Sequence, residues 1–151
     1  MPESPTTDRV ITPKSIRSRE ALVIASLLDE PTATPGPNIS LVLAHWQWFE
    51  DPLCGQVANA IRKCGTRPHT EPLLSEYLTD CRVLFNPAFT RGGLPLIQAE
   101  VEAGDLVRYY TGKRIARLIG QAYSECHKNP SDAVQVAMRL RKALSVYECD
   151  P

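Results

Sequence analysis

The sequence lacks any apolar stretch long enough to cross a lipid bilayer, which takes about 20 residues in a helix. Its start, MPESPTTDRV, is polar and contains proline, so it lacks the hydrophobic segment of a secretory signal peptide. A membrane-spanning protein and a secreted protein are therefore both disfavoured. We expect a cytoplasmic protein that makes no contact with a membrane.

The chain also lacks an excess of either charge. Its 151 residues include 17 Lys and Arg and 17 Asp and Glu, so the formal net charge is zero. No global field would draw the protein to nucleic acid or to an anionic membrane. Contact with DNA would have to come from a local patch. With 43% hydrophobic residues, the chain can bury the core of one domain.

Patterns typical of metal sites and disulfide frameworks are missing as well. The five cysteines, at positions 54, 64, 81, 126 and 149, include no C-x-x-C pair. The three histidines, at positions 45, 69 and 127, have no H-x-x-x-H spacing. We therefore expect reduced, mostly buried thiols and no metal ligands.

No catalytic constellation is recognisable in the sequence. The chain has no serine elbow, no Cys/His dyad and no Gly-rich phosphate loop. The pair Gly112-Lys113 has Val107 where a P-loop needs its first glycine, and Arg114 where it needs Ser or Thr. We expect no catalytic residues, no cofactor and no enzymatic activity.

The spacing of apolar residues predicts helices and no strand of convincing length, so the predicted fold class is all-α. Residues 1–15 are rich in Pro, Ser, Thr and charge and are predicted to form a flexible tail. Residues 16–104 are expected to form a small helical globule of about four or five helices. Residues 105–148 are expected to form an antiparallel helical hairpin in the same domain.

Several helix ends in the globule can be predicted from local chemistry. Asp51-Pro52 is a strong helix start, because Asp caps a helix and Pro suits its first position. Gly65 can close that helix in a left-handed conformation. Residues 83–93, which contain two pairs of helix breakers, are predicted as coil. One more helix is expected to follow and to end at Gly104.

The hairpin prediction rests on two apolar stripes joined by a turn. Asp105 is placed to cap the first helix, and Asn129-Pro130 stops it. The first stripe consists of Ile115, Leu118, Ile119, Ala122, Tyr123 and Cys126. The second consists of Ala133, Val136, Ala137, Leu140, Leu144 and Tyr147. Neither helix can bury its stripe alone, so we expect the hairpin to pack against its own chain or against another copy of it.

Both tryptophans lie in one short segment, HWQWFEDP. Trp46, Trp48 and Phe49 cannot all face one way, so at least one ring is expected to be only partly covered. These rings either form a lid on the core or anchor a protein interface. The predicted protein interface consists of Ile115, Leu118, Ile119, Ala122, Tyr123, Leu140, Leu144, Trp46 and Trp48.

Two segments carry motifs of a known family. Residues 19–28, REALVIASLL, follow the pattern A-E-x-x-V-L-G-x-L-L, with Ala25 at the glycine position. Residues 49–61, FEDPLCGQVANAI, follow F-x-D-P-x-H-x-x-I-F-x-A-I, with Cys54 at the histidine position and Ala58 at the aromatic position. A weaker similarity covers residues 92–110. Together these segments resemble the N-terminal collar domain of bacterial replicative DNA helicases of the DnaB type.

The resemblance implies a helical globule followed by a protruding hairpin. In that family the domains associate through their hairpins and form a collar that docks primase and loading proteins. The helicase-binding domain of primase shares much of that architecture. By this resemblance the chain is a non-catalytic interaction module of DNA replication, either a detached collar domain or a free-standing protein. It would associate with itself, as a dimer or higher oligomer, and with a replicative helicase, primase or loader.

An alternative prediction is a helix-turn-helix DNA-binding regulator that uses residues 113–127. The spacing of Ala116 and Gly120 imitates the small-residue and glycine positions of that motif. Its DNA-contact residues would be Lys113, Arg114 and Arg117. This alternative requires a turn near Gly120, and one uninterrupted helix over residues 106–127 would exclude it.

Overall fold

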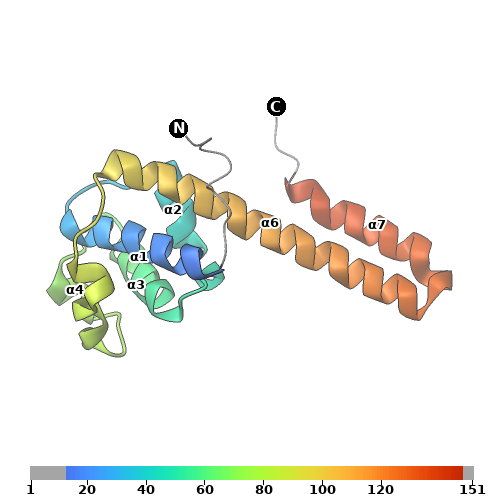
Figure 1. Cartoon of the computed structure of the whole chain (residues 1–151), viewed down its shortest axis with the longest axis horizontal. Helices are drawn as coiled ribbons and strands as arrows, with labels where there is room; N and C mark the ends of the chain where they lie inside the picture. Colours follow the sequence, from blue (N-terminus) through green and yellow to red (C-terminus); the bar gives the residue numbers. More distant parts are fainter. Residues whose placement is uncertain (1–12, 148–151) are drawn as a thin grey trace, which may run out of the picture. The chain divides into compact units, whose positions relative to one another are not determined.

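Every regular element that the structure describes is helical. The computed structural model describes residues 13–147, and no strand occurs among them (Figure 1). The α-helices are α1 (Pro13–Asp29), α2 (Pro37–Ala44), α3 (Pro52–Cys64), α4 (Glu71–Ser75), α5 (Pro87–Thr90), α6 (Leu96–Lys128) and α7 (Ala133–Leu144). Short 3-10 helices cover Trp46–Trp48, Cys81–Phe85, Pro130–Asp132 and Ser145–Tyr147. The predicted all-α class is confirmed.

The chain divides into two compact units. Unit 1 ends at Val107 and unit 2 begins at Arg108, so α6 contributes its first part to unit 1 and the remainder to unit 2. Most of the predicted tail, residues 1–12, lies outside the described residues. The last positions of that predicted tail are helical, because α1 begins at Pro13. None of the described helices combines the length and the apolar character needed to cross a bilayer.

The helix α1 supplies much of the core of unit 1. Ile16, Val23, Ile24, Ala25 and Leu27 are all fully buried, and they point to several sides of the helix. A helix that is apolar on several sides needs neighbours on more than one face. These neighbours include α3 and α5, both of which contact α1.

A buried carboxylate joins α1 to the turn before α3. Glu20 is fully buried, and its two oxygens accept hydrogen bonds from the backbone N–H groups of Glu50 at 2.8 Å and Asp51 at 3.0 Å. The Asp51 carboxylate accepts from the N–H of Leu53 at 3.0 Å, so Asp51 caps α3 as predicted. At the other end, Gly65 has a φ of +64°, the positive φ that the sequence predicts.

A second carboxylate ties α6 to α2. Glu100 accepts from the N–H of Asn38 at 2.7 Å and from that of Ile39 at 3.0 Å, so it occupies the N-terminus of α2. Asn38 also lies against Gly104, where an added Cβ would come within 3.0 Å of the Asn38 amide nitrogen. Gly104 therefore allows two helices to approach closely, and it does not end a helix. The predicted helix end at Gly104 and the predicted cap at Asp105 are wrong, because α6 continues through both.

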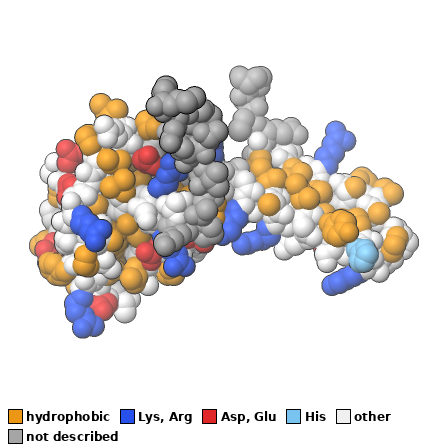
Figure 2. Space-filling view, viewed as in Figure 1, with side chains coloured by type: hydrophobic (Ala, Val, Ile, Leu, Met, Phe, Trp, Pro, Cys, Tyr) orange, Lys and Arg blue, Asp and Glu red, His pale blue; other side chains and the backbone are white. Residues whose placement is uncertain are grey.

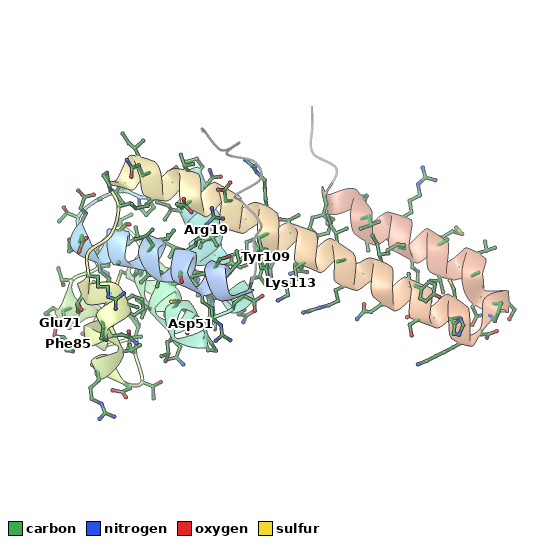
Figure 3. The ribbon with its side chains drawn as sticks, viewed as in Figure 1. Arg19, Asp51, Glu71, Phe85, Tyr109 and Lys113 are labelled. Carbon is green, nitrogen blue, oxygen red and sulfur yellow. The ribbon has the colours of Figure 1, made fainter. Side chains whose placement is uncertain are left out.

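Asp105 instead takes part in a tertiary contact inside unit 1. It is 7% exposed, and its carboxylate lies 3.6 Å from the guanidinium of Arg19 on α1. Arg19, labelled in Figure 3, also lies 3.1 Å from the carboxylate of Glu102. Arg19 therefore links α1 to two positions on α6.

The segment predicted as coil, residues 83–93, is partly helical. It contains most of the 3-10 helix Cys81–Phe85 and all of α5. The side chain of Asn86 accepts from the N–H of Ala88 at 2.9 Å and caps α5. The coil prediction failed because elements of five and four residues are too short to show a helical period.

Unit 2 pairs the C-terminal part of α6 with α7, which runs back beside it (Figure 1). The 3-10 turn between them is held by its own side chains. The amide of Asn129 donates to Asp132 at 2.8 Å, and the hydroxyl of Ser131 donates to Asn129 at 2.6 Å. These bonds fix the turn locally, at the Asn-Pro break that the sequence predicts.

Candidate functional site

The two helices of unit 2 meet along an apolar seam. Leu118 and Ala122 of α6 and Val136, Leu140 and Ala143 of α7 line one shallow pocket of about 170 Å³. Val136 is 3% exposed and the other four are half-buried. Among the residues described from 111 onward, Val136 is the one buried hydrophobic side chain. The hairpin therefore has a narrow interior, and most of its surface lies outside that interior.

The predicted interface residues of the hairpin fall into two groups. The first group is half-buried and consists of Ile115, Leu118, Ala122, Leu140 and Leu144. Of these, Leu118, Ala122 and Leu140 line the seam. The second group consists of Ile119 and Tyr123, which are 49% and 71% exposed. Only the second group is thus available in large part to another molecule.

Ile119 and Tyr123 lie on one side of α6, which we call the apolar flank together with the small residues beside them. At about 100° per residue, Gly112 and Ala116 share that side with Ile119 and Tyr123. The ring of Tyr123 stacks on that of His127, with centroids 6.0 Å apart and an interplanar angle of 13°. Figure 2 shows hydrophobic side chains gathered on the visible face of the hairpin. The flank is therefore an exposed surface that is largely apolar.

Sequence reasoning missed three exposed hydrophobic residues on the second half of the hairpin. Val134, Met138 and Val146 are 72%, 68% and 77% exposed. They lie outside the stripe that faces α6, and the sequence prediction considered one apolar stripe on each helix. The spacing of Val134 and Met138, one helical turn apart on α7, was the available signal.

The two tryptophans belong to unit 1, apart from the other predicted interface residues. Trp46 and Trp48 form a 3-10 helix, and both are half-buried, as the prediction of partly covered rings requires. Trp48 stacks on His45, with centroids 3.9 Å apart and an interplanar angle of 5°. Trp46 and Trp48 thus belong to a different unit from Ile119 and Tyr123.

The helix-turn-helix alternative is wrong. It needs a turn near Gly120, but α6 is helical from Leu96 to Lys128 without interruption. A Cβ added at Gly120 would meet nothing within 4 Å, so no close neighbour requires a glycine at this position. Its proposed DNA contacts, Lys113, Arg114 and Arg117, are instead exposed positions on the continuous helix. Lys113, labelled in Figure 3, has its ammonium 5.8 Å from the ring of Tyr109.

Unit 1 contains a larger pocket, of about 310 Å³, beside the loop before α2. Two arginines line it, and both have partners. Arg62 donates to Asn59 at 2.8 Å, and Arg67 donates to the Tyr77 hydroxyl at 2.6 Å. The lining also contains the hydroxyls of Thr32, Thr34, Ser40 and Thr66 and the buried His69, whose Nε2 lies 2.6 Å from the carbonyl oxygen of Leu27.

Among the described residues, the ionisable groups form no metal-binding cluster. Within residues 13–147, no three His, Cys, Asp or Glu side chains are placed to hold a metal ion together. Cys54 is buried and donates to Asp51, with Sγ 3.5 Å from the carboxylate. Burial, together with the negative charges of Asp51 and Glu20, raises the pKa of the Cys54 thiol. A thiol of raised pKa stays protonated and is a poor nucleophile.

Comparison with protein-family models, with curated proteins and with solved structures found no match to this chain.

Proposed function

We propose that this chain is a non-catalytic protein–protein interaction module that associates with itself, as a two-fold dimer, through its helical hairpin. One observation carries the proposal. Among the residues described from 111 onward, Val136 is the one buried hydrophobic side chain, whereas five large ones are about half exposed or more. These are Ile119, Tyr123, Val134, Met138 and Val146. So much apolar surface on so few residues is typical of an interaction site.

The apolar flank is suited to a second copy of itself. Gly112 and Ala116 are small, and a Cβ added at Gly112 or Gly120 would meet nothing within 4 Å. The large side chains of Ile119 and Tyr123 stand beside these small positions. In a two-fold interface the same patch faces itself, so the large residues of one copy can lie over the small residues of the other. This self-complementarity favours a second copy as the partner.

The test measures association state by sedimentation over a range of protein concentrations. Ile119→Glu places a charge on the apolar flank and should convert a dimer into a monomer. Ser124→Glu, on an exposed position of the same helix away from both that flank and the seam, is the matched control and should leave the dimer intact. Circular dichroism should show equal helicity for both. A wild-type chain that stays monomeric at high micromolar concentration would contradict the proposal.

Leu118 and Leu144 are poor sites for this test. Leu118 lines the seam, and Leu144 is half-buried on the seam side of α7, so a charge at either position would disrupt the hairpin itself. Ile119 is the better choice because its substitution changes the outer surface and leaves the seam in place.

We further propose that the module acts in the cytoplasm in DNA replication, through contact with a replicative helicase, primase or loader. The support is the resemblance to the helicase collar domain, together with a contact between the two segments that carry it. Glu20, in the first motif, accepts hydrogen bonds from the backbone of Glu50 and Asp51, in the second. The two motifs therefore build one structural feature. This contact is a packing contact. It supports the proposed collar-domain fold, and the identity of the binding partner rests on the resemblance alone.

Binding to replication proteins can be tested with purified components. The wild-type chain is immobilised and exposed separately to replicative helicase, primase and loader, and binding is measured by surface plasmon resonance. The same measurement with Ile119→Glu shows whether these proteins bind to the apolar flank. Saturable binding to at least one of the three supports the role, and the absence of binding to all three contradicts it.

A further inference from the structure

The chain as a whole has a formal net charge of zero, but its two units carry net charges of opposite sign. Unit 1 contains nine Lys and Arg against thirteen Asp and Glu, whereas unit 2 contains eight against four. Within the described part of unit 2 the excess is larger, because the acidic residues there are Glu125 and Asp132. The basic residues are Arg108, Lys113, Arg114, Arg117, Lys128, Arg139, Arg141 and Lys142. The hairpin is thus a local patch of positive charge.

Half of these eight cations lie on one side of the hairpin. At about 100° per residue, Arg117 and Lys128 fall on the side of α6 that carries Glu125. Glu125 bonds to Arg139 of α7, which places Arg139 on the same side of the pair. Lys142 follows Arg139 by three residues and shares its side. We call Arg117, Lys128, Arg139 and Lys142 the basic flank.

The basic flank and the apolar flank lie on opposite sides of the hairpin. Ile119 and Tyr123 are about 120° and about 160° around α6 from Glu125. The positions of α6 between Arg117 and Lys128 on the basic side include Gln121 and Ser124, which are exposed, uncharged and able to donate hydrogen bonds. Exposed Gln135 occupies the corresponding side of α7. The flank thus combines cations with neutral donors.

This combination fits a phosphodiester backbone better than the other anionic surfaces. Protein interfaces depend on apolar and aromatic anchors at their centre. On this flank such side chains are confined to α7 and the turn after it, where Met138 and Val146 lie four residues before and after Lys142, and the α6 side has none. A helix that binds an anionic membrane must turn its apolar face to the lipid, which here would point the basic flank away. Phosphate groups need only cations and hydrogen-bond donors.

We propose that the basic flank binds the phosphate backbone of nucleic acid without reading base sequence. The contact requires no helix-turn-helix, and it uses the side of the hairpin that is not needed for self-association. Arg117 and Lys128, the outermost of the four cations, are about 17 Å apart along α6, from the rise of about 1.5 Å per residue, which is a stretch of about five nucleotides. If each cation meets one phosphate, log affinity should fall with log salt at a slope of about −4 on duplex or about −3 on single strands.

The experiment measures binding of the full chain to labelled 20-nucleotide single-stranded DNA and to the matching duplex by fluorescence anisotropy. Arg117→Gln, Lys128→Gln and Lys142→Gln are combined in one variant. The control combines Arg17→Gln, Lys63→Gln and Arg91→Gln, which removes the same charge from exposed positions of unit 1. Circular dichroism and sedimentation verify that both variants keep the helicity and the association state of the wild type.

The expected result is saturable binding of the wild type to one or both DNA forms, with the stronger form identifying the preferred substrate. The hairpin variant should lose at least about 10-fold in affinity at low salt, and its salt slope should fall to about −1. The control should lose less than about 3-fold.

Three results would overturn the proposal: no wild-type binding to either DNA, equal loss in both variants, or tighter binding to another polyanion than to DNA. The other polyanions are vesicles containing phosphatidylserine and soluble polyglutamate. The first stands for a membrane and the second for an acidic protein partner. Because sedimentation reports self-association separately, failure of DNA binding leaves the dimer proposal independently testable.

Discussion

Arg139 on α7 donates a hydrogen bond to the carboxylate of Glu125 on α6, with Nη2 and Oε2 3.0 Å apart. The two side chains are 69% and 51% exposed, so water and salt screen this ion pair. The attraction between α6 and α7 must therefore come mainly from the apolar seam. Leu118, Val136 and Leu140 supply the surface that the pairing removes from water.

Val136→Ala should destabilise the hairpin more than Arg139→Ala. Removing two buried methyl groups costs about 2 kcal/mol of unfolding free energy, whereas an exposed ion pair is worth less than about 1 kcal/mol. Urea denaturation followed by circular dichroism gives both values. An equal or larger loss in Arg139→Ala would show that the ion pair is the main link between the helices.

Replacing both Gly112 and Gly120 by alanine should stabilise the monomer and weaken its association. Alanine favours a helix interior by about 1 kcal/mol over glycine, and the added methyl groups meet nothing within 4 Å. In the proposed dimer, the same methyl groups would occupy space needed by Ile119 and Tyr123 of the other copy. Denaturation at low concentration and sedimentation at high concentration separate the two effects. If association is unchanged or stronger in this variant, Gly112 and Gly120 do not lie in the dimer interface.

Glu20→Gln should be strongly destabilising. The buried carboxylate accepts two backbone N–H groups, and the substitution replaces one acceptor oxygen with a donor nitrogen that faces an N–H. We expect a loss of about 3 kcal/mol, because a buried donor is left without a partner and a charged acceptor is lost. Glu76→Gln, at an exposed position of unit 1, should change stability by less than about 0.5 kcal/mol. Thermal and urea unfolding of the two variants test this difference.

The stability of the chain should fall at alkaline pH partly because of Cys54. Burial raises the pKa of this thiol in the folded state, whereas the unfolded thiol ionises near its ordinary value of about 8.5. Above that pH, unfolding releases a proton, so the unfolding free energy falls by about 1.4 kcal/mol per pH unit for this group. Below that pH the thiol is protonated in both the folded and the unfolded state, so it contributes nothing to the pH dependence of the unfolding free energy.

The measurement compares the wild type with Cys54→Ala by urea denaturation from about pH 8 to about pH 10. The unfolding free energy of the variant should decline less steeply with pH than that of the wild type. Its value at neutral pH also changes, because the substitution removes packing around position 54. Cys64, whose pKa burial also raises, is present in both proteins and cancels in the comparison. Identical declines would mean that Cys54 ionises as easily in the fold as outside it.

Local chemistry was a good guide to the fold where one residue decides a helix end. Asp51 and Gly65 act as predicted because capping and a positive φ depend on the residue and its immediate neighbours. Gly104 shows the limit of such reasoning. Its role is to let Asn38 approach, which depends on a helix more than sixty residues away in the chain. No local pattern distinguishes that use of glycine from a helix end.

The candidate site was only partly predictable for a related reason. A period of 3.6 residues identifies an apolar stripe but does not say which molecule covers it. Leu118 and Leu140 were assigned to an interface, yet they lie in the seam between the helices of their own chain. Ile119 and Tyr123, one position further around the helix, are the exposed ones. The charge separation was invisible in the total because the excess acid of unit 1 offsets the excess base of unit 2.

The continuity of α6 across Val107 and Arg108 has a consequence for dissecting the protein. Severing the chain there would cut a helix in mid-course and expose about four unpaired backbone groups on each new end. The liberated pieces would also lose the helical turns that nucleate their neighbours. A protease or a gene truncation that separates unit 1 from unit 2 should therefore unravel the cut helix in both fragments. A shortened protein that keeps either unit should retain the whole of Leu96–Lys128.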